Sequence, residues 1–373
     1  MILAIISHTP HYNMDGGIVG WGPTVREINH LTEMFEKIYH IAPLHEEPAP
    51  GSSMKYIDEK IEFVPLKKSG GENISDKITI LKTAYPNLKI ISRTIKNADW
   101  VQFRAPTGMG LYVLPYLSLK SSPKRWVKYA GNWGQKNPPL SYSIQRWWLK
   151  RNLQKSKVTV NGKWKNSGKH ILDFRNPCLD NDELMRANKI SSEKEFSGKL
   201  TFCFAGALSE NKGVNLILEA LEKIRFSEKI NEFIFAGGGH DKEMLEISAD
   251  KLKVKTSFTG FISRNELEKI YEKSHIIVLP SQSEGFPKVI SEAAAYGCVP
   301  IISDVSAISE YFNDSNGFML KTLEAGHLAN AIDLALSNTD LLKIKSVACT
   351  KISSLFTYEN YMSELKNRVI NAK

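Results

Sequence analysis

The chain has 373 residues, 42% of them hydrophobic, and a formal net charge of +9. This length favours two domains over one, each with its own apolar core. No stretch has the uninterrupted apolar length of a membrane span, and residues 1–6 lack the features of a signal peptide, so we expect a cytoplasmic protein. The four cysteines are far apart and show no metal-binding spacing, which predicts free buried thiols.

The positive charge is concentrated in the first half of the chain. Residues 1–176 carry 26 Lys and Arg against 13 Asp and Glu, whereas residues 177–373 carry 23 against 27. Residues 82–175 alone hold 19 basic and two acidic side chains, and all seven tryptophans lie at or before Trp164. A basic surface with interleaved aromatic residues suggests an anionic partner, either nucleic acid or a layer of lipid headgroups.

The first half begins with a predicted strand at residues 2–7, a loop at residues 8–22 and a helix at residues 23–35. Glycines let a backbone approach a ligand closely, so Gly16 and Gly17 of the loop are candidate contacts. The two histidines of the same loop are expected to have structural roles.

Polar side chains follow two further predicted strands, at residues 99–104 and 125–130. In an open parallel sheet the ligand crevice lies at the carboxyl ends of the strands, which is where Arg104 and Asn132 fall. An arginine there can neutralise phosphate, whereas Asn132 is equally well explained as an ordinary polar residue at a strand end. Residues 44–75 are polar and predict surface loops with one short strand.

A basic, tryptophan-containing helix is predicted to begin at Ser141, a plausible cap. Helical spacing would place several of its large and basic side chains on one face: Ile144, Trp147, Trp148, Arg151 and Lys155. This combination suits a membrane interface, although the tryptophans could instead pack inward beneath a solvated basic face. The charge of residues 82–175 as a whole favours membrane contact.

The second domain is predicted to open with a strand at residues 199–204. The turn that follows, residues 206–213, carries Lys212, which can reach a phosphate group. A later strand ends at Gly237 in a run of three glycines, and another at residues 257–261 could cover a nucleobase with its end. Strands and helices that alternate in this way predict doubly wound parallel sheets.

The most informative stretch is a short apolar strand at residues 276–279 followed by a loop and a helix. Pro287 suits the first position of that helix, which leaves the next amide groups as unpaired donors for phosphate: those of Lys288, Val289 and Ile290. Glu284 before the helix and Glu292 within it would then face groups beyond opposite ends of a diphosphate. A carboxylate that accepts hydrogen bonds from two vicinal hydroxyls can hold a ribose or a hexose.

These two glutamates stand in the setting Pro-Ser-x-x-Glu-Gly-Phe-Pro-x-x-x-x-Glu-Ala-x-Ala-x-Gly. This setting resembles the E-x7-E signature of retaining nucleotide-sugar glycosyltransferases of family 4. Three further segments match the family in order: residues 204–213, 233–239 and 258–271. The resemblance covers residues 198–320 well and the first half weakly.

The resemblance implies an α/β fold of the GT-B type, with two doubly wound Rossmann-like domains that face a central cleft. The expected domains are residues 1–176, completed by a C-terminal helix at residues 357–373, and residues 177–356. The first would bind the acceptor and the second the nucleotide-sugar.

The resemblance also implies the roles of individual residues. Glu284 would orient the transferred sugar and Glu292 the ribose, with Lys212, Arg104 and Asn132 as further catalytic candidates. The implied donor-binding residues are Gly16, Gly17, Gly206, Gly237, Phe261, Ile262, Gly285, Phe286, Pro287, Lys288, Val289, Ile290 and Glu292. Because no Asp-x-Asp cluster lies beside the signature, amides and cations rather than a metal or other cofactor would stabilise the leaving diphosphate.

The expected function is therefore transfer of a sugar, with retention, from a UDP-sugar or secondly a GDP-sugar. The acceptor would be lipid-linked or a polysaccharide, as in the synthesis of bacterial lipopolysaccharide or capsule, at the inner face of the cell membrane. Two departures from the family favour an alternative, a catalytically silent nucleotide-sugar-binding subunit: Ala207 stands where an arginine is usual, and the usual first-domain histidine is not evident. A nucleic-acid partner is not expected, because no recognised binding motif is present.

Overall fold

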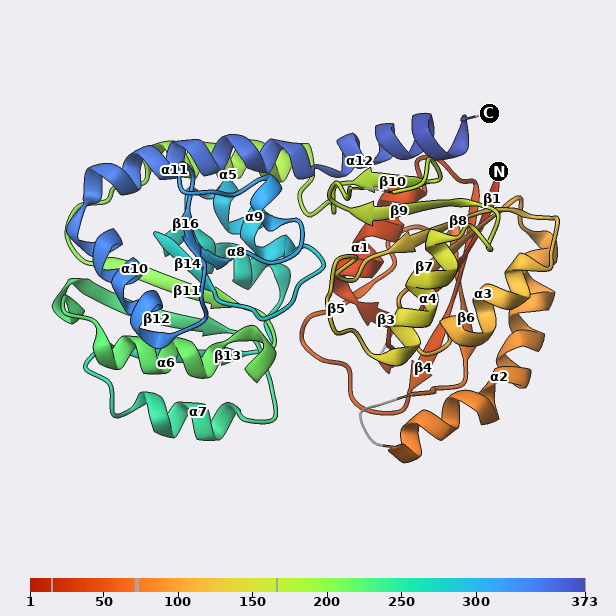
Figure 1. Ribbon diagram of the computed structural model, residues 1–373, viewed down its shortest axis with the longest axis horizontal. Helices are drawn as coiled ribbons and strands as arrows, with labels where there is room; N and C mark the ends of the chain where they lie inside the picture. The colour runs from red at the N-terminus through yellow and green to blue at the C-terminus, as the bar shows by residue number, and fades with distance from the viewer. Residues whose placement is uncertain (15, 71–73, 166, 373) are drawn as a thin grey trace. The chain divides into compact units, whose positions relative to one another are not determined.

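The computed structural model describes residues 1–14, 16–70, 74–165 and 167–372. The chain divides into two compact units, one made of residues 1–175 and 362–373 and the other of residues 176–361 (Figure 1). The sequence analysis put these boundaries after residue 176 and before residue 357. Each unit is an α/β layer structure with a mainly parallel sheet, and each is described below by itself.

The sheet of the first unit has the spatial order β10-β9-β8-β7-β1-β4-β2-β3-β5, and β6 pairs with β4. Its strands are β1 (Ile2–Ile6), β2 (His11–Met14), β3 (Gly17–Trp21), β4 (Lys37–His45), β5 (Ser53–Lys55), β6 (Ile61–Leu66), β7 (Trp100–Ala105), β8 (Lys124–Tyr129), β9 (Lys157–Asn161) and β10 (Ile171–Phe174). The chain winds outward from β1 through β4 and β6, and then returns to β7 on the other side of β1. The topological switch point of this sheet therefore lies between β1 and β7.

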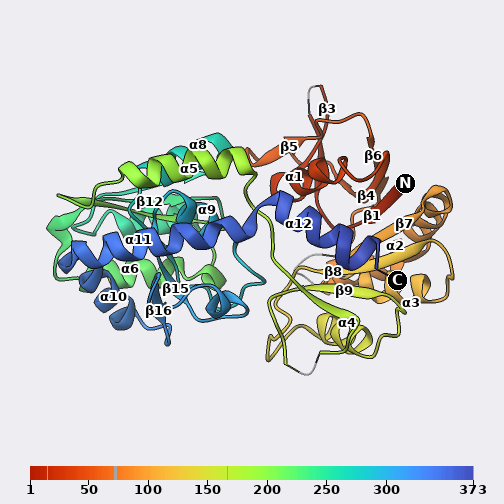
Figure 2. The same cartoon turned by 90° about the horizontal axis from the view of Figure 1, so that it is seen from above.

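Helices cover both faces of this sheet. Three of them, α2 (Ile74–Thr94), α3 (Gly110–Ser118) and α4 (Leu140–Lys150), lie on one face, and α1 (Gly22–Leu31) lies on the other (Figures 1 and 2). The apolar core on the α2–α4 side includes side chains from the strands β1, β4, β7, β8 and β9. Nearly every residue of β1 and β7 is buried, as the apolar runs in the sequence predict.

The predicted loop at residues 8–22 contains a β-hairpin instead. The strands β2 and β3 pair antiparallel, with Gly16 and Gly17 at the turn between them. Both glycines have a positive φ, +89° and +127°, a conformation that is costly for other residues. The prediction failed because the alternating pattern of this stretch is weak and rich in glycine.

Residues 44–75 are also more ordered than expected. They include the end of the nine-residue strand β4, the short strands β5 and β6, and the beginning of α2. The strand β4 occupies a central place, because it pairs in parallel with both β1 and β6.

The helix α4 differs from the prediction at both ends and in its faces. Pro139, not Ser141, is the cap residue, and Lys150 is the last helical residue, so Arg151 and Lys155 lie beyond the helix. The two tryptophans point in different directions. Trp148 packs against the core and donates a hydrogen bond to Ser118 Oγ at 3.2 Å, whereas Trp147 is about half exposed.

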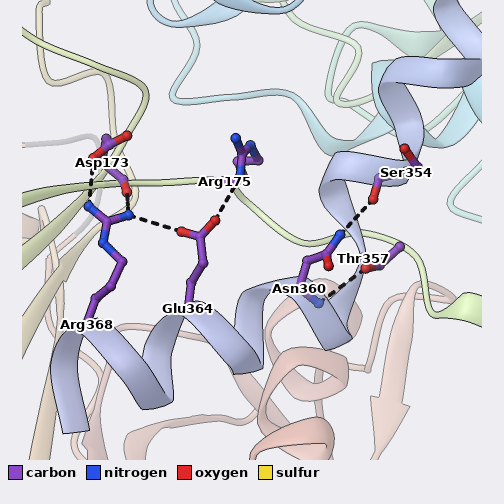
Figure 3. Close-up of polar contacts among 7 residues, drawn as sticks. All are labelled: Asp173, Arg175, Ser354, Thr357, Asn360, Glu364 and Arg368. Atoms are coloured by element: carbon purple, nitrogen blue, oxygen red, sulfur yellow. Dashed lines mark hydrogen bonds and ion pairs between the residues drawn. The ribbon is translucent and has the colours of Figure 1, made fainter. Parts of the chain in front are cut away.

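The end of the chain belongs to the first unit. The helix α12 (Tyr358–Leu365) starts among residues of the second unit, and a short π-helical turn, Lys366–Ile370, completes it. Figure 3 shows Glu364 paired with Arg175 at 2.7 Å and Arg368 paired with Asp173 at 2.8 Å. These ion pairs join the last residues of the chain to the end of the segment 1–175.

The sheet of the second unit has the order β13-β12-β11-β14-β15-β16, with parallel pairing throughout. Its strands are β11 (Leu200–Ala205), β12 (Ile230–Ala236), β13 (Thr256–Gly260), β14 (Ile276–Leu279), β15 (Val299–Ser303) and β16 (Phe318–Leu320). The chain moves outward from β11 to β13 and then crosses to β14 on the other side of β11. The switch point of this sheet therefore lies between β11 and β14.

Helices sandwich the second sheet as well. One face carries α5 (Asn181–Glu193), α8 (Arg264–Lys273), α9 (Lys288–Ala295) and α11 (Thr339–Ser353), and the other carries α6 (Val214–Lys223), α7 (Lys242–Ala249) and α10 (Ala325–Ser337) (Figure 1). The four cysteines are free and buried, as predicted. Within the described residues, no helix has the length and apolar character needed to cross a membrane.

The turns after β11 and β12 touch so closely that only glycine fits. A Cβ atom added to Gly237 would lie 1.8 Å from the carbonyl oxygen of Gly206, and Gly237 has a φ of +148°. We therefore expect Gly237→Ala to lower the free energy of unfolding by at least about 2 kcal/mol, because backbone strain and overpacking each cost about 1 to 3 kcal/mol. Urea unfolding of the full chain measures this.

The matched control is Gly326→Ala in α10, where an added Cβ meets no atom within 4 Å. This change should be neutral or stabilising by up to about 1 kcal/mol, because alanine favours the helix. Equal stability of the two variants would contradict the close approach.

Candidate functional site

The site of the second unit lies at the carboxyl ends of β11 and β14, on either side of the switch point. The turn after β11 and the loop after β14 contact each other directly. The amide of Gln282 donates to the carbonyl oxygen of Asn211 at 2.8 Å, and a Cβ on Gly213 would lie 2.4 Å from the carbonyl oxygen of Pro280. The parallel order of the sheet thus brings together two motifs that are about 70 residues apart in sequence.

An ion pair bridges these two segments. Lys212 Nζ lies 2.5 Å from Glu284 Oε1, and the glutamate side chain is 9% exposed while that of the lysine is 25% exposed. The structure therefore joins two predicted catalytic residues at the switch point. Each neutralises the other, and the lysine ammonium still has access to solvent on one side.

The helix α9 begins one residue later than predicted. Pro287 is its cap and Lys288 its first helical residue. The amide of Ile290 donates to the carbonyl oxygen of Pro287 at 3.2 Å, so this amide is not an unpaired donor as predicted.

The residues before α9 are fixed by the core. Phe286 is buried, and its ring stacks on Phe356 with a centroid distance of 4.6 Å. The carbonyl oxygen of Gly285 accepts a hydrogen bond from Ser306 Oγ at 2.9 Å. Phe286 therefore offers a ligand its backbone rather than its ring, and it holds the loop that carries Glu284 in place.

Glu292 is the most strongly held carboxylate of the site. It is 6% exposed, and its Oε1 lies 2.6 Å from Arg264 Nη1, while its Oε2 accepts from the hydroxyl of Tyr271 at 3.3 Å. The carboxylate is thus oriented before any ligand binds. Arg264 was missed by the sequence analysis, and the hydroxyl of Tyr271 was not assigned a role.

Arg264 is the centre of a buried cluster of charges. Besides Glu292, its guanidinium lies 2.9 Å from Glu268 and 3.9 Å from Glu183. Burial lowers the pKa of Arg264, but the carboxylates of Glu292 and Glu183 outweigh this and hold the pKa well above its ordinary value. Burial raises the pKa of Glu268, and burial followed by the charge of Glu292 raises that of Tyr271.

The turns after β11, β12 and β13 complete this edge of the sheet. Gly206 and Gly237 are in contact, as described above. Phe261 is 54% exposed and its ring covers Gly238, because a Cβ added there would lie 2.3 Å from the ring. Ile262 packs against the core. The exposed ring of Phe261 is therefore the one suited to stack on a planar ligand.

Of the predicted residues of the first unit, Arg104 lies beside its switch point, in a second buried ion cluster. Arg104, in β7, makes a bidentate contact with Glu27 of α1, with Nη–Oε distances of 3.0 and 3.4 Å. Lys128 Nζ lies 2.6 Å from the same carboxylate. Two cations thus share one carboxylate. Asn132 caps a turn, since its side chain accepts from the amide of Gly134 at 3.0 Å.

Two buried histidines beside this cluster form a hydrogen-bonded chain. His40 contacts Ser7 Oγ at 2.7 Å and the hydroxyl of Tyr56, and His11 contacts the same hydroxyl at 2.7 Å. Burial lowers the pKa of His11 to about 4 and that of His40 well below its ordinary value. Neutral imidazoles suit this chain, and the two histidines join Ser7 after β1 to Tyr56 after β5, which is a structural role of the kind expected for His11.

Comparison with known proteins places the second unit in a family. Residues 185–348 match the family model described as "Glycosyl transferases group 1". The second unit thus contains a region similar to group 1 glycosyltransferases. The resemblance drawn from the sequence is therefore confirmed, and the site around Glu284 and Glu292 lies within the residues that the family model matches.

Two curated relatives share this glycosyltransferase region. One, an uncharacterized glycosyltransferase of Methanocaldococcus jannaschii, is 28% identical over 170 residues, which is 44% of this chain and 43% of the relative. The other is a Campylobacter jejuni α-1,4-N-acetyl-D-galactosaminyltransferase whose name gives an undecaprenol-diphosphate-linked glycan. It is 27% identical over 207 residues, 55% of this chain and 49% of the relative. The chain thus matches about half the length of these relatives.

A solved structure shows that the similarity of fold extends over both units. Anabaena HepE in complex with UDP and glucose has a TM-score of 0.69, covers 99% of both chains and is 14% identical. Together with the two α/β units and their mainly parallel sheets, this confirms the predicted GT-B fold class.

The charge cluster around Arg264 can be tested by removing its only arginine. We expect Arg264→Met to lower the free energy of unfolding by about 3 to 5 kcal/mol, because the buried carboxylates of Glu183 and Glu292 and the partly buried one of Glu268 would lose their shared cation. Urea unfolding of the full chain measures this, with Arg186→Met on the exposed side of α5 as the control.

The control should change the free energy of unfolding by no more than about 0.5 kcal/mol. If Arg264→Met were as stable as the control, the carboxylates would not depend on this guanidinium.

Proposed function

We propose that the protein transfers a sugar, with retention of configuration, from a nucleotide-sugar to an acceptor hydroxyl in the synthesis of a surface glycan. The observation that carries this proposal is the pairing of Glu284 with Lys212 and of Glu292 with Arg264 at the switch point of a group 1 glycosyltransferase domain. The transferred sugar and the ribose each need a fixed carboxylate to accept their hydroxyl hydrogen bonds. The diphosphate that joins them needs a cation and amide groups, placed between these two carboxylates.

In this proposal the bond between the anomeric carbon and the diphosphate oxygen breaks, and the acceptor oxygen takes its place on the same face. The acceptor's hydroxyl proton passes to the departing diphosphate, so no protein nucleophile is required. Lys212 and the amides near Val289 stabilise the diphosphate without a metal ion. Glu284 orients the sugar and Glu292 the ribose, while Phe261 covers the base.

The position of Ala207 leaves the proposed diphosphate site one cation short of the family pattern. Arg104 is our candidate for the missing charge. It is already paired with Glu27, so a role at the diphosphate requires that it exchange this partner. Lys128 could then neutralise Glu27, because it already contacts the same oxygen that Arg104 holds.

UDP is the favoured nucleotide and GDP the second, with a lipid-linked or polysaccharide acceptor. The HepE structure with UDP and glucose and the name of the Campylobacter relative support this choice. We further propose that the protein works at the inner face of the cell membrane. Trp147 supports this: it is 48% exposed on α4, and the guanidinium of Arg151 lies 4.7 Å from its ring, a pairing suited to lipid headgroups.

The alternative is a partner subunit that binds a nucleotide-sugar without turning it over. The absent arginine at position 207 motivates it. Release of UDP from a UDP-sugar by the pure protein, with or without acceptor, would exclude this alternative.

Calorimetric titration of the full chain with UDP, GDP and ADP, in the presence of EDTA, tests the donor site. We expect one nucleotide to bind, and Glu292→Ala to weaken it by roughly 10- to 100-fold, because hydrogen bonds to a charged group contribute about 1.5 to 3 kcal/mol. The absence of binding by all three would contradict the proposal.

The matched control is Glu219→Ala, which removes an exposed glutamate of α6. It should bind like the wild type. If Glu292→Ala also bound like the wild type, Glu292 would not hold the ribose.

A further inference from the structure

The first unit contains a large pocket at the carboxyl ends of its parallel strands. Its volume is about 940 Å³, and its wall includes residues at the end of β4 and after β1, β6 and β7, such as Pro43, His8, Lys67 and Thr107. The strands β1 and β7 flank the switch point of this sheet, where a doubly wound sheet offers its ligand crevice. The place of the pocket in the fold therefore identifies it as a ligand site.

Most side chains of the wall are apolar. Ile80, Met109 and Tyr142 form part of it, and its edge carries aliphatic side chains that are exposed to an unusual extent. Leu81 of α2 is 78% exposed and Leu140 of α4 is 77% exposed. Leaving large aliphatic side chains in water around an apolar pocket is unfavourable unless a hydrocarbon ligand covers them.

One side of the same pocket is positively charged. Lys67 and Lys68 follow β6, and both are exposed. Lys68 is paired with Glu47, whereas Lys67 has no ion pair among the residues that the structure describes. Asn87 fixes the backbone of Lys67: it accepts from the Lys67 amide at 3.0 Å and donates to its carbonyl oxygen at 3.1 Å. This backbone clamp holds the residue that carries the Lys67 side chain at one side of an apolar pocket.

We propose that this pocket binds the lipid-phosphate part of the acceptor, a phosphate on an extended hydrocarbon chain. The chain would lie against Leu81, Leu140 and Ile144, and Lys67 would contact the phosphate. The identification of this ligand as the acceptor rests on the proposed sugar transfer. The pocket, its exposed leucines and its lysine do not depend on the donor site.

Calorimetry with decyl phosphate, below the concentration at which it aggregates, tests the pocket in the full-length protein. Decyl phosphate should bind, and decanol and inorganic phosphate should each bind at least roughly 10-fold more weakly, because each lacks one half of the ligand. Equal binding of decanol would overturn the role of the cation. Binding to anionic vesicles without any binding of decyl phosphate would show a membrane surface rather than a pocket, and would also overturn the proposal.

Matched variants locate the binding. Leu140→Asp and Lys67→Ala should each weaken decyl phosphate at least roughly 10-fold. The control for Leu140→Asp is Leu119→Asp, which changes an 86% exposed leucine just after the C-terminal end of α3. The control for Lys67→Ala is Lys96→Ala, which changes an exposed lysine. Neither control residue lines the pocket. Unchanged affinity in both pocket variants would place the ligand elsewhere.

Two further arms separate the possible sources of the ligand and the two proposals. Dihexanoyl phosphatidic acid carries two chains, as a structural membrane lipid does, so binding tighter than that of decyl phosphate would overturn the assignment to a single-chain acceptor. Titration with UDP and GDP in the same samples reports on the donor site. Binding of decyl phosphate without binding of a nucleotide would support the lipid-phosphate pocket and contradict the proposed sugar transfer. Binding of a nucleotide without binding of decyl phosphate would contradict only the proposed pocket.

Discussion

The need to neutralise buried carboxylates governs the second unit. A carboxylate removed from water is costly unless a cation or several donors compensate for it. Glu284 and Glu292 are both nearly inaccessible, and each is paired with a cation, Glu284 with Lys212 and Glu292 with Arg264. These pairs also fix geometry, because Lys212 joins the two loops at the switch point while Arg264 joins α8 to α9. A polyhydroxyl ligand would thus meet acceptor groups that are already oriented, with little ordering left to do.

The pairing of Lys212 with Glu284 could be predicted from the sequence, whereas the pairing of Arg264 with Glu292 could not. Strand, turn and helix patterns in the second half of the chain are clear, and Lys212 and Glu284 each follow a predicted strand, so a parallel sheet brings them together. Arg264 gives no such signal, since it lies at a polar helix start that reads as a solvated surface. It becomes buried only because the strand order returns from β13 to β14 and so lays α8 beside α9.

The errors in the first half have a similar cause. Gly16 and Gly17 suggest a flexible loop, but their positive φ angles serve a tight hairpin whose strands gain partners only from the distant β4 and β5. On α4, helical spacing groups Trp147 with Trp148, although adjacent residues on a helix differ by about 100° in direction. One tryptophan therefore faces the core while its neighbour faces solvent. In both places, long-range packing decided what the local pattern left open.

The two units share one topological feature but line it with different side chains. Each has a switch point at the carboxyl edge of its sheet. The edge of the second unit is lined by fixed charges and glycine turns, whereas that of the first has one ion cluster, around Glu27, and opens into a mostly apolar pocket. The same type of sheet can thus form a polar crevice in one unit and an apolar one in the other, because the loops rather than the strands determine the polarity of the residues that line the crevice.

The return of the last residues to the first unit affects how this chain can be divided. A fragment that stops at residue 175 would leave Arg175 and Asp173 without Glu364 and Arg368, their ion-pair partners. A chimaera that exchanges one unit with that of a relative therefore needs two crossover points, one near residue 175 and one near residue 361. Recombination at a single point would separate the first unit from its own C-terminal helix.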